Sequence, residues 1–264
     1  MNRENTVNEL GFNWQDTLIW CRHSPAPTEL PLAAAQALLG QGSELLPPVR
    51  GTVFGTLLND KKALQALGDA VHQDPYKAPP KAPILYIKPR NSHCAHGDRI
   101  PLPQGIDGLL AGPALGLVIG RTACRVPRDE ALSYLAGYTI VNDLTVPHDS
   151  YYRPALPCKA RDHSCPIGPW VRAPRQIANP DQLAITVRVN DSIRLQANTA
   201  DLIRPVAQLL HEVSAFMTLN AGDILLAGVP AGAPLLHAGD TVSVEIEQIG
   251  TLTNTLIAAQ GGAL

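Results

Sequence analysis

Apolar and polar positions alternate over much of the chain with the two-residue period of β-strands. The alternation is clean in 241–249, and 183–189 shows it before a turn at Asn190-Asp191-Ser192. Other short runs are apolar throughout, which is typical of strands buried on both faces. The strands predicted in this way are 51–58, 84–87, 114–119, 138–141, 183–189 and 241–249.

Helical spacing occurs in fewer places. Apolar residues recur every three or four positions within 199–219, which predicts one long amphipathic helix. Pro127 and Gly137 delimit a second helix at 128–136. Shorter helices are predicted at 32–39, before Gly40, and from Asn59-Asp60 to about residue 71. Strands dominate, so we expect an α+β fold with a mixed, curled or barrel-like sheet.

Residues 1–50 differ from the rest because prolines surround one short Ala/Leu-rich stretch. We expect an N-terminal arm or cap over 1–50 and one main domain over 51–264. No internal repeat is visible.

Composition narrows the function classes. Of the 264 residues 45% are hydrophobic and 17% charged, so the chain is expected to be globular. The net charge of −2, without a basic block, argues against nucleic acid as a partner. The apolar runs are too short for a transmembrane helix, and the N-terminus lacks a secretory signal pattern, so we expect a cytoplasmic protein. The 5 cysteines form no Cys-x-x-Cys pair and are interpreted as free thiols.

The segment 137–170 holds the densest chemistry of the chain. An apolar run ends at Asn142-Asp143, and Lys159, Arg161 and Asp162 follow a short way on. A carboxylate at a strand end, facing several cations in a loop, suits an anionic substrate. A charged surface loop is the alternative interpretation. His148 and His163 flank the cations and are candidates for an acid or base, or for ordinary polar loop residues.

Taken in order, these landmarks resemble the fumarylacetoacetate hydrolase family over residues 51–258. Each motif is weak alone, but the series is specific. The matching motifs are Gly51-Thr-Val-Phe-Gly-x-x-x-Asn59, Ile87-Lys88-Pro89, Val118-Ile-Gly120, Ala136-Gly-Tyr138, Asn142-Asp143, Lys159-x-x-Asp162, Pro166-x-Gly-Pro169, Leu219-x-x-Gly-Asp223 and Gly239-Asp240.

Within the family, the chain is most similar to the N-terminal half of the bifunctional isomerase/decarboxylases of 4-hydroxyphenylacetate degradation. Those enzymes decarboxylate 5-oxopent-3-ene-1,2,5-tricarboxylate and isomerise 2-hydroxyhepta-2,4-dienedioate. The closer match lies in Pro75-Tyr-Lys-Ala-Pro-Pro-Lys81, Ile87-Lys-Pro-Arg-Asn91, Tyr152-Arg-Pro154, Arg161-Asp162 and Asn198-Thr-Ala-Asp-Leu202.

The resemblance implies Mg²⁺ or Mn²⁺ in the family, held by a Glu-x-Glu pair and by the aspartate that is Asp143 here. In this chain Gly112 and Ala114 replace the two glutamates. A family histidine falls near Ala63, and a Thr-Gly-Thr-Pro turn has become Ala227-Gly-Val-Pro230. We therefore expect that this chain binds no metal tightly and that a partner subunit carries the cation.

The charged residues that remain form a candidate cationic pocket and suggest site roles. Lys159, Asp162 and Asp143 are the expected catalytic residues, with Lys159 stabilising an enolate or moving a proton. The expected substrate-binding residues are Lys88, Tyr152, Arg153 and Arg161, which suit a di- or tricarboxylate. The alternative is that Lys159 and Asp143 form only a structural ion pair.

Two functions follow as hypotheses. One is an isomerase or decarboxylase (lyase) subunit of aromatic catabolism that works without a tightly bound metal. The other is a non-catalytic partner that supports a metal-bearing homologue. Both imply a homodimer or a hetero-oligomer with a homologous subunit, with neither nucleic acid nor membrane as a partner.

Overall fold

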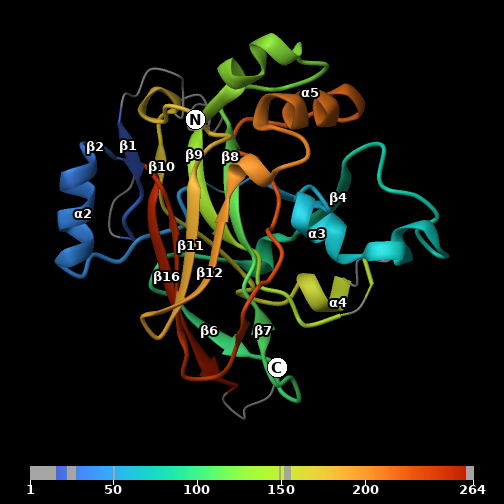
Figure 1. Ribbon diagram of the computed structural model, residues 1–264. Helices are drawn as coiled ribbons and strands as arrows, with labels where there is room; N and C mark the ends of the chain where they lie inside the picture. Colours follow the sequence, from blue (N-terminus) through green and yellow to red (C-terminus); the bar gives the residue numbers. More distant parts are fainter. Residues whose placement is uncertain (1–15, 23–27, 50, 149, 152–155, 260–264) are drawn as a thin grey trace.

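The larger sheet forms the centre of the molecule. The computed structural model describes residues 16–22, 28–49, 51–148, 150–151 and 156–259 (Figure 1). The sheet is largely antiparallel, and β3 and β13 pair in parallel. Its strand order is β2 (Thr28–Leu30), β1 (Thr17–Ile19), β10 (Cys165–Arg172), β9 (Leu135–Asn142), β8 (Pro113–Ile119), β13 (Ile224–Leu226), β3 (Val53–Leu57) and β4 (Ile84–Lys88), with β5 (His93–Cys94) beside β10.

A second sheet packs against one face of the first. Its order is β12 (Ser192–Asn198), β11 (Ala184–Val189), β15 (Thr241–Ile246), β16 (Gly250–Ala258) and β6 (Arg99–Leu102), and a two-stranded ribbon joins β7 (Leu109–Leu110) to β14 (Leu235–Leu236). Leu115, Leu117 and Ile119 of β8 face the main core between the sheets, together with Val187 and Val244. Every residue of β8, β9 and β10 is buried, so both faces of the central strands are covered.

The predicted α+β class with mixed sheets and few helices is confirmed. The described strands form open sheets and not a closed barrel, because the order of the large sheet ends at β2 and β4. The predicted turn after β11 is also present, with Asn190 and Asp191 at φ values of 50° and 66°.

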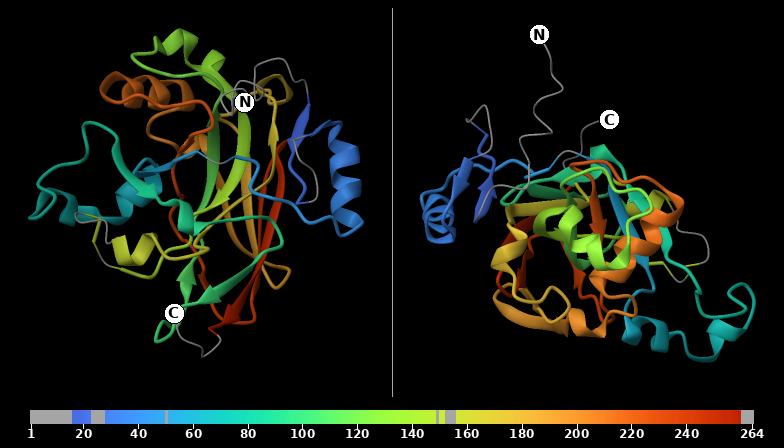
Figure 2. Two further views of the ribbon diagram at one scale, coloured as in Figure 1. Left: turned by 180° about the vertical axis from the view of Figure 1, so that it is seen from behind. Right: turned by 90° about the horizontal axis from the view of Figure 1, so that it is seen from above.

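The helices lie at the borders of the sheets (Figures 1 and 2). Helix α2 lies at one lateral edge, and α3 and α4 lie at the other. None of the helices in the described ranges has the length and hydrophobicity needed to cross a bilayer. The helices are α2 (Leu32–Gly40), α3 (Lys61–Ala66), α4 (Leu156–Lys159) and α5 (Val206–Phe216), with 3₁₀ turns at Gly68–His72, Arg90–Ser92, Arg128–Tyr134, Pro174–Gln176 and Thr199–Asp201.

Two helix predictions were too long. The helix predicted at 199–219 spans only Val206–Phe216, because the backbone N–H groups of Ile203 and Arg204 bond to Asn59 instead of continuing a helix. The segment 128–136 forms a 3₁₀ helix that ends at Tyr134, since Leu135 already pairs in β9.

The described part of residues 16–49 packs on the outside of β10. Thr17 pairs with Arg172, and Leu18 pairs with Val171. Ile19, Ala35, Leu45 and Trp170 form a small hydrophobic cluster separate from the main core cluster. This segment extends the edge of the large sheet on the side away from α3 and α4 (Figure 1).

Candidate active site

A buried carboxylate lies where β9 ends. Asp143 follows the last residue of β9, and its backbone N–H donates to the Gly112 carbonyl at 2.7 Å. The Asn142 side chain accepts from the Gly112 N–H at 2.8 Å. These two bonds tie the end of β9 to the start of β8 and fix the direction of the Asp143 side chain.

Two lysines from distant segments meet this carboxylate. Lys88 Nζ, at the end of β4, lies 2.9 Å from Asp143 Oδ1, and Lys159 Nζ, at the end of α4, lies 2.8 Å from Oδ2. The side chain of Lys88 is 0% exposed and that of Lys159 is 9% exposed. The structure thus brings together the three charged residues that the sequence separates by up to 71 positions.

The Lys88 ammonium is fully occupied. It donates to the Leu144 carbonyl and to Ser164 Oγ, each at 3.0 Å, and to the Lys159 carbonyl. An ammonium has three protons, so Lys88 attracts Asp143 Oδ1 by charge without a further aligned hydrogen bond. Lys88 therefore holds Asp143 and the α4 end in place, and it has no donor left for a substrate.

Lys159 is bound more loosely, at the wall of a cavity. It donates to Asp143 Oδ2 and, at 3.0 Å, to Thr145 Oγ1. Its ammonium also lies 4.2 Å from the centre of the Tyr86 ring, within the range of a cation–π contact.

Tyr86 completes the cluster, and Gly55 makes room for it. Tyr86 and Lys88 are two residues apart on β4, so both point inward, while Ile87 between them is 50% exposed. The Tyr86 hydroxyl donates a short hydrogen bond to Asp143 Oδ2. A Cβ at Gly55, its partner on β3, would lie 2.0 Å from the Tyr86 ring.

The environment keeps this carboxylate charged. Burial alone would raise the pKa of Asp143, but the charges of Lys159 and Lys88 and the bonds from Lys159 and Tyr86 outweigh burial and hold the pKa well below its ordinary value. Burial, then the charge of Asp143, raises the pKa of the Tyr86 phenol well above its ordinary value. Asp143 is thus a weak base, and Tyr86 remains a proton donor in a hydrogen bond.

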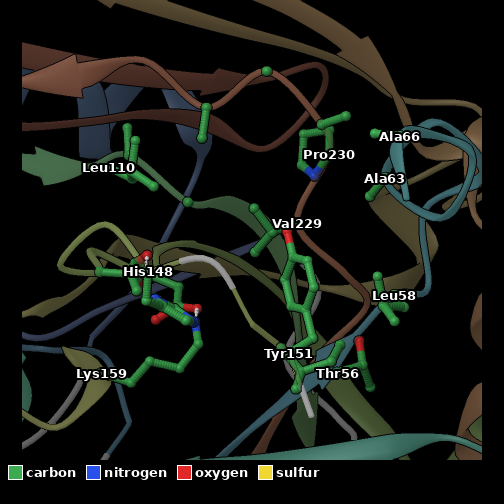
Figure 3. A pocket seen from close by; sticks show the side chains of 18 of the residues that line it. Thr56, Leu58, Ala63, Ala66, Leu110, His148, Tyr151, Lys159, Val229 and Pro230 are labelled. Carbon is green, nitrogen blue, oxygen red and sulfur yellow. Dashed lines mark hydrogen bonds and ion pairs between the residues drawn. The ribbon is translucent and has the colours of Figure 1, made fainter. Parts of the chain in front are cut away.

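A cavity of about 450 Å³ opens beside the cluster. Its polar lining comes mainly from Asp143, Lys159, Thr145, His148 and Tyr86. Figure 3 shows Lys159 and His148 on one side of the cavity, with Leu58 and the α3 residues Ala63 and Ala66 on the other. The remaining wall comes from Thr56, Tyr151 and the mostly apolar positions Leu57, Leu67, Leu110, Ala111, Gly112, Val229, Pro230, Ala231, Gly232 and Ala233.

The other predicted site residues do not gather here. Arg161 is half-buried and Asp162 is exposed, and neither lines the cavity. Asp162 accepts a hydrogen bond from Asn91, whereas Arg161 Nε is buried without a hydrogen-bond partner among the described residues. The predicted substrate-binding residues Tyr152 and Arg153 lie outside the described residues.

The surroundings of Asp143 do not fit a divalent cation. Both carboxylate oxygens face ammonium groups, which compete with a cation for the same atoms. A Cβ at Gly112 would lie 2.3 Å from the Asp143 carbonyl oxygen, and Ala114 is completely buried in the sheet. The described residues contain no group of three or more His, Cys, Asp or Glu side chains arranged to hold a metal.

Sequence reasoning missed Tyr86 and Thr145. Tyr86 could have been predicted, because the two-residue alternation of 84–88 places it on the same face of the strand as Lys88. Thr145 gives no such signal, since only the turn after Asp143 brings its hydroxyl to Lys159. His148 lines the cavity, whereas its counterpart His163 is exposed.

Known proteins share this fold and sequence pattern. The chain is 42% identical over 209 residues to the 4-hydroxyphenylacetate degradation bifunctional isomerase/decarboxylase of Escherichia coli, an alignment that covers 79% of this chain and 48% of that protein. The chain thus spans about half the length of this relative.

Solved structures of other proteins have a similar fold. The 2-hydroxyhepta-2,4-diene-1,7-dioate isomerase from Mycobacterium marinum is similar with a TM-score of 0.70 and 28% identity, covering 90% of this chain and 83% of that one. Maleylpyruvate hydrolase from Sphingobium sp. SYK-6, in complex with manganese(II) and pyruvate, gives 0.69 and 25%, covering 86% and 81%. The fumarylacetoacetate (FAA) hydrolase C-terminal family matches residues 52–257, and the chain therefore belongs to this family.

Proposed function

We propose that this chain binds 2-hydroxyhepta-2,4-dienedioate in the cavity beside Lys159 and isomerises it, without a tightly bound metal. Decarboxylation of 5-oxopent-3-ene-1,2,5-tricarboxylate is the related step that the same site would serve. Both reactions develop negative charge on an enolate oxygen, and a preorganised ammonium in a dry site stabilises such charge strongly. In this proposal Lys159 faces that oxygen, and Asp143 and Lys88 hold Lys159 in place.

The observation that carries the proposal is the charge balance of the cluster. Two ammonium groups face one carboxylate, so a buried positive charge remains in excess at the cavity wall. Buried charges are costly unless they are paired. A substrate carboxylate or enolate would supply the missing negative charge.

The shape of the cavity agrees with a long, partly apolar acid. Its volume of about 450 Å³ lies within the usual range of small-molecule sites. Leu58, Ala63 and Val229 form an apolar wall against which the hydrocarbon chain of the substrate would pack. The charged cluster lies at one side of the cavity.

The test measures turnover of the hydroxydienedioate by the purified chain as a decrease in the dienol absorbance. The assay is run once with EDTA and once with added Mg²⁺. Lys159→Met removes the ammonium and should lower kcat/KM by about 100-fold or more. Lys81→Met, at an exposed position away from the cavity, is the matched control. Undiminished turnover by a folded Lys159→Met protein would reject the role of Lys159.

A second candidate is a non-catalytic partner of a metal-bearing homologue. The observation that favours it is the replacement of the two family glutamates, whose positions are Gly112 and Ala114 in this chain. If this is the function, the purified chain alone is inactive, and addition of the homologous subunit restores turnover that requires Mg²⁺.

A further inference from the structure

His148 is a titratable side chain of the cavity to which no role has yet been given. It lies in the loop that follows Asp143, is half-buried, and lines the cavity with Lys159 (Figure 3). Its Nδ1 is 3.0 Å from the Val146 carbonyl. A carbonyl only accepts, so Nδ1 carries the proton, and Nε2 of the neutral ring is an acceptor. The Tyr151 ring meets the imidazole edge-on, with the ring centres 6.3 Å apart.

The other titratable groups of the described cavity lining are poorly suited to exchange a proton. Asp143 is held charged by Lys88 and Lys159, and the Tyr86 hydroxyl is committed to Asp143. Burial raises the pKa of Tyr151 above its ordinary value. The Lys159 ammonium is directed at Asp143 and Thr145.

Isomerisation requires a group that takes up one proton and releases it elsewhere. In 2-hydroxyhepta-2,4-dienedioate the enol O–H proton must leave, and C5 must gain a proton, so that the C2=C3 and C4=C5 double bonds give way to C2=O and C3=C4. The electron pair of the O–H bond becomes the C2=O bond, the C2=C3 pair becomes the C3=C4 bond, and the C4=C5 pair forms the new C5–H bond. No oxidant or reductant is needed, and the substrate and product differ only in the position of one proton. Histidine is the side chain whose ordinary titration falls between pH 5 and 8.

We infer that Nε2 of His148 accepts the enol proton of the dienedioate and delivers it to C5. This assignment rests on the proposed function, because it needs the substrate oxygen to lie at Lys159. Lys159 then stabilises the enolate between the two proton transfers, and His148 moves the proton. Figure 3 shows the two side chains on the same side of the cavity, as this division of roles requires.

The test compares His148→Gln with His163→Gln. Glutamine retains a side-chain amide of similar reach but cannot exchange a proton, and His163 is an exposed loop histidine outside the cavity. Isomerisation is run in D₂O, with turnover and deuterium incorporation at C5 both measured. His148→Gln should lower kcat and deuterium incorporation by about 100-fold or more, and His163→Gln should leave both unchanged.

Two further readouts separate proton transfer from substrate binding. The Kd of a non-reacting 2-oxo dicarboxylate should change less than threefold in His148→Gln. The pH–rate profiles of wild type and variant should also differ in shape, since the other titratable groups of the described cavity lining, Tyr86, Asp143, Tyr151 and Lys159, are present in both.

The outcomes distinguish the two proposals. An active wild type together with an equally active His148→Gln overturns the role of His148 alone. An active wild type that decarboxylates but incorporates no deuterium at C5 overturns it as well. A wild type without turnover or exchange overturns the proposed function, and the assignment of His148 falls with it.

Discussion

Asp143 is held as a buried carboxylate by partners from separate parts of the chain. Lys88 and Tyr86 come from β4, and Lys159 comes from α4. Removing one member of a buried ion pair typically costs about 3–5 kcal/mol, because the remaining charge stays buried without its partner. The cluster therefore contributes to stability as well as to any chemistry in the cavity.

Asp143→Asn tests this contribution through its pH dependence. At pH 7 the free energy of unfolding of the variant should be lower than that of the wild type by about 3–5 kcal/mol, because two buried ammonium groups lose their counter-charge. The pKa of Asp143 is lower in the folded state than in the unfolded state, so its contribution is complete above the unfolded value of about 4 and is lost as the pH falls below it. The difference between wild type and variant should therefore shrink on acidification.

Denaturant unfolding at pH 7, 5, 4 and 3 measures this difference. Asp107→Asn, at an exposed aspartate, is the control and should change the free energy of unfolding by no more than about 0.5 kcal/mol. A difference that stays constant from pH 7 to pH 3 would contradict the account of Asp143.

At the residue scale, the sequence predicted part of the candidate site. It placed Asp143 at a strand end and anticipated its pairing with Lys159, because both belong to motifs of a known family. It also placed Arg161 and Asp162 in the site, Asp162 through the family motif Lys159-x-x-Asp162 and Arg161 as a cation for an anionic substrate. Proximity in sequence does not give side-chain direction, and the chain leaves the cavity immediately after α4.

At the scale of elements, the pairing of β3 with β4 determines where Tyr86 lies. Gly55→Ala should push the ring away from Asp143 and lower the free energy of unfolding by about 1–3 kcal/mol, the usual cost of overpacking. In the double variant Gly55→Ala/Tyr86→Ala the added methyl group should cost much less, which a double-mutant cycle measures.

Gly40→Ala is the matched control for this prediction. A Cβ at Gly40, the last residue of α2, meets nothing within 4 Å. This variant should be neutral or slightly more stable. An equal cost of Gly55→Ala with and without Tyr86 would show that the glycine is needed for another reason.

Some strands were predicted with nearly correct bounds, whereas others were missed. The bounds of β8, β11 and the end of β4 were predicted from local alternation or from apolar runs. α5 was overestimated because its apolar spacing continues into 199–205, where hydrogen bonds to Asn59 determine the backbone instead. Such long-range bonds leave no local pattern. The pairing of β1 with β10 was not predicted for the same reason.

At the scale of the whole molecule, the chain covers 48% of its bifunctional relative. The partner proposed above is a homologous subunit. Co-expression with a homologue that bears Glu-x-Glu should give a hetero-oligomer, with its mass measured by light scattering after size exclusion. Recovery of this chain as a monomer or homodimer only, with the homologue well expressed, would contradict the expectation.

The close approach at Gly112 limits which residues the turn accepts. A Cβ built at residue 112 would lie 2.3 Å from the carbonyl oxygen of Asp143, so any side chain there would clash with it. The same carbonyl accepts a hydrogen bond from the Thr145 hydroxyl. Glutamate introduced at 112 would therefore disturb the turn before it could offer a metal ligand. A single substitution at this position is not expected to create a metal site, and the backbone of the turn would have to move as well.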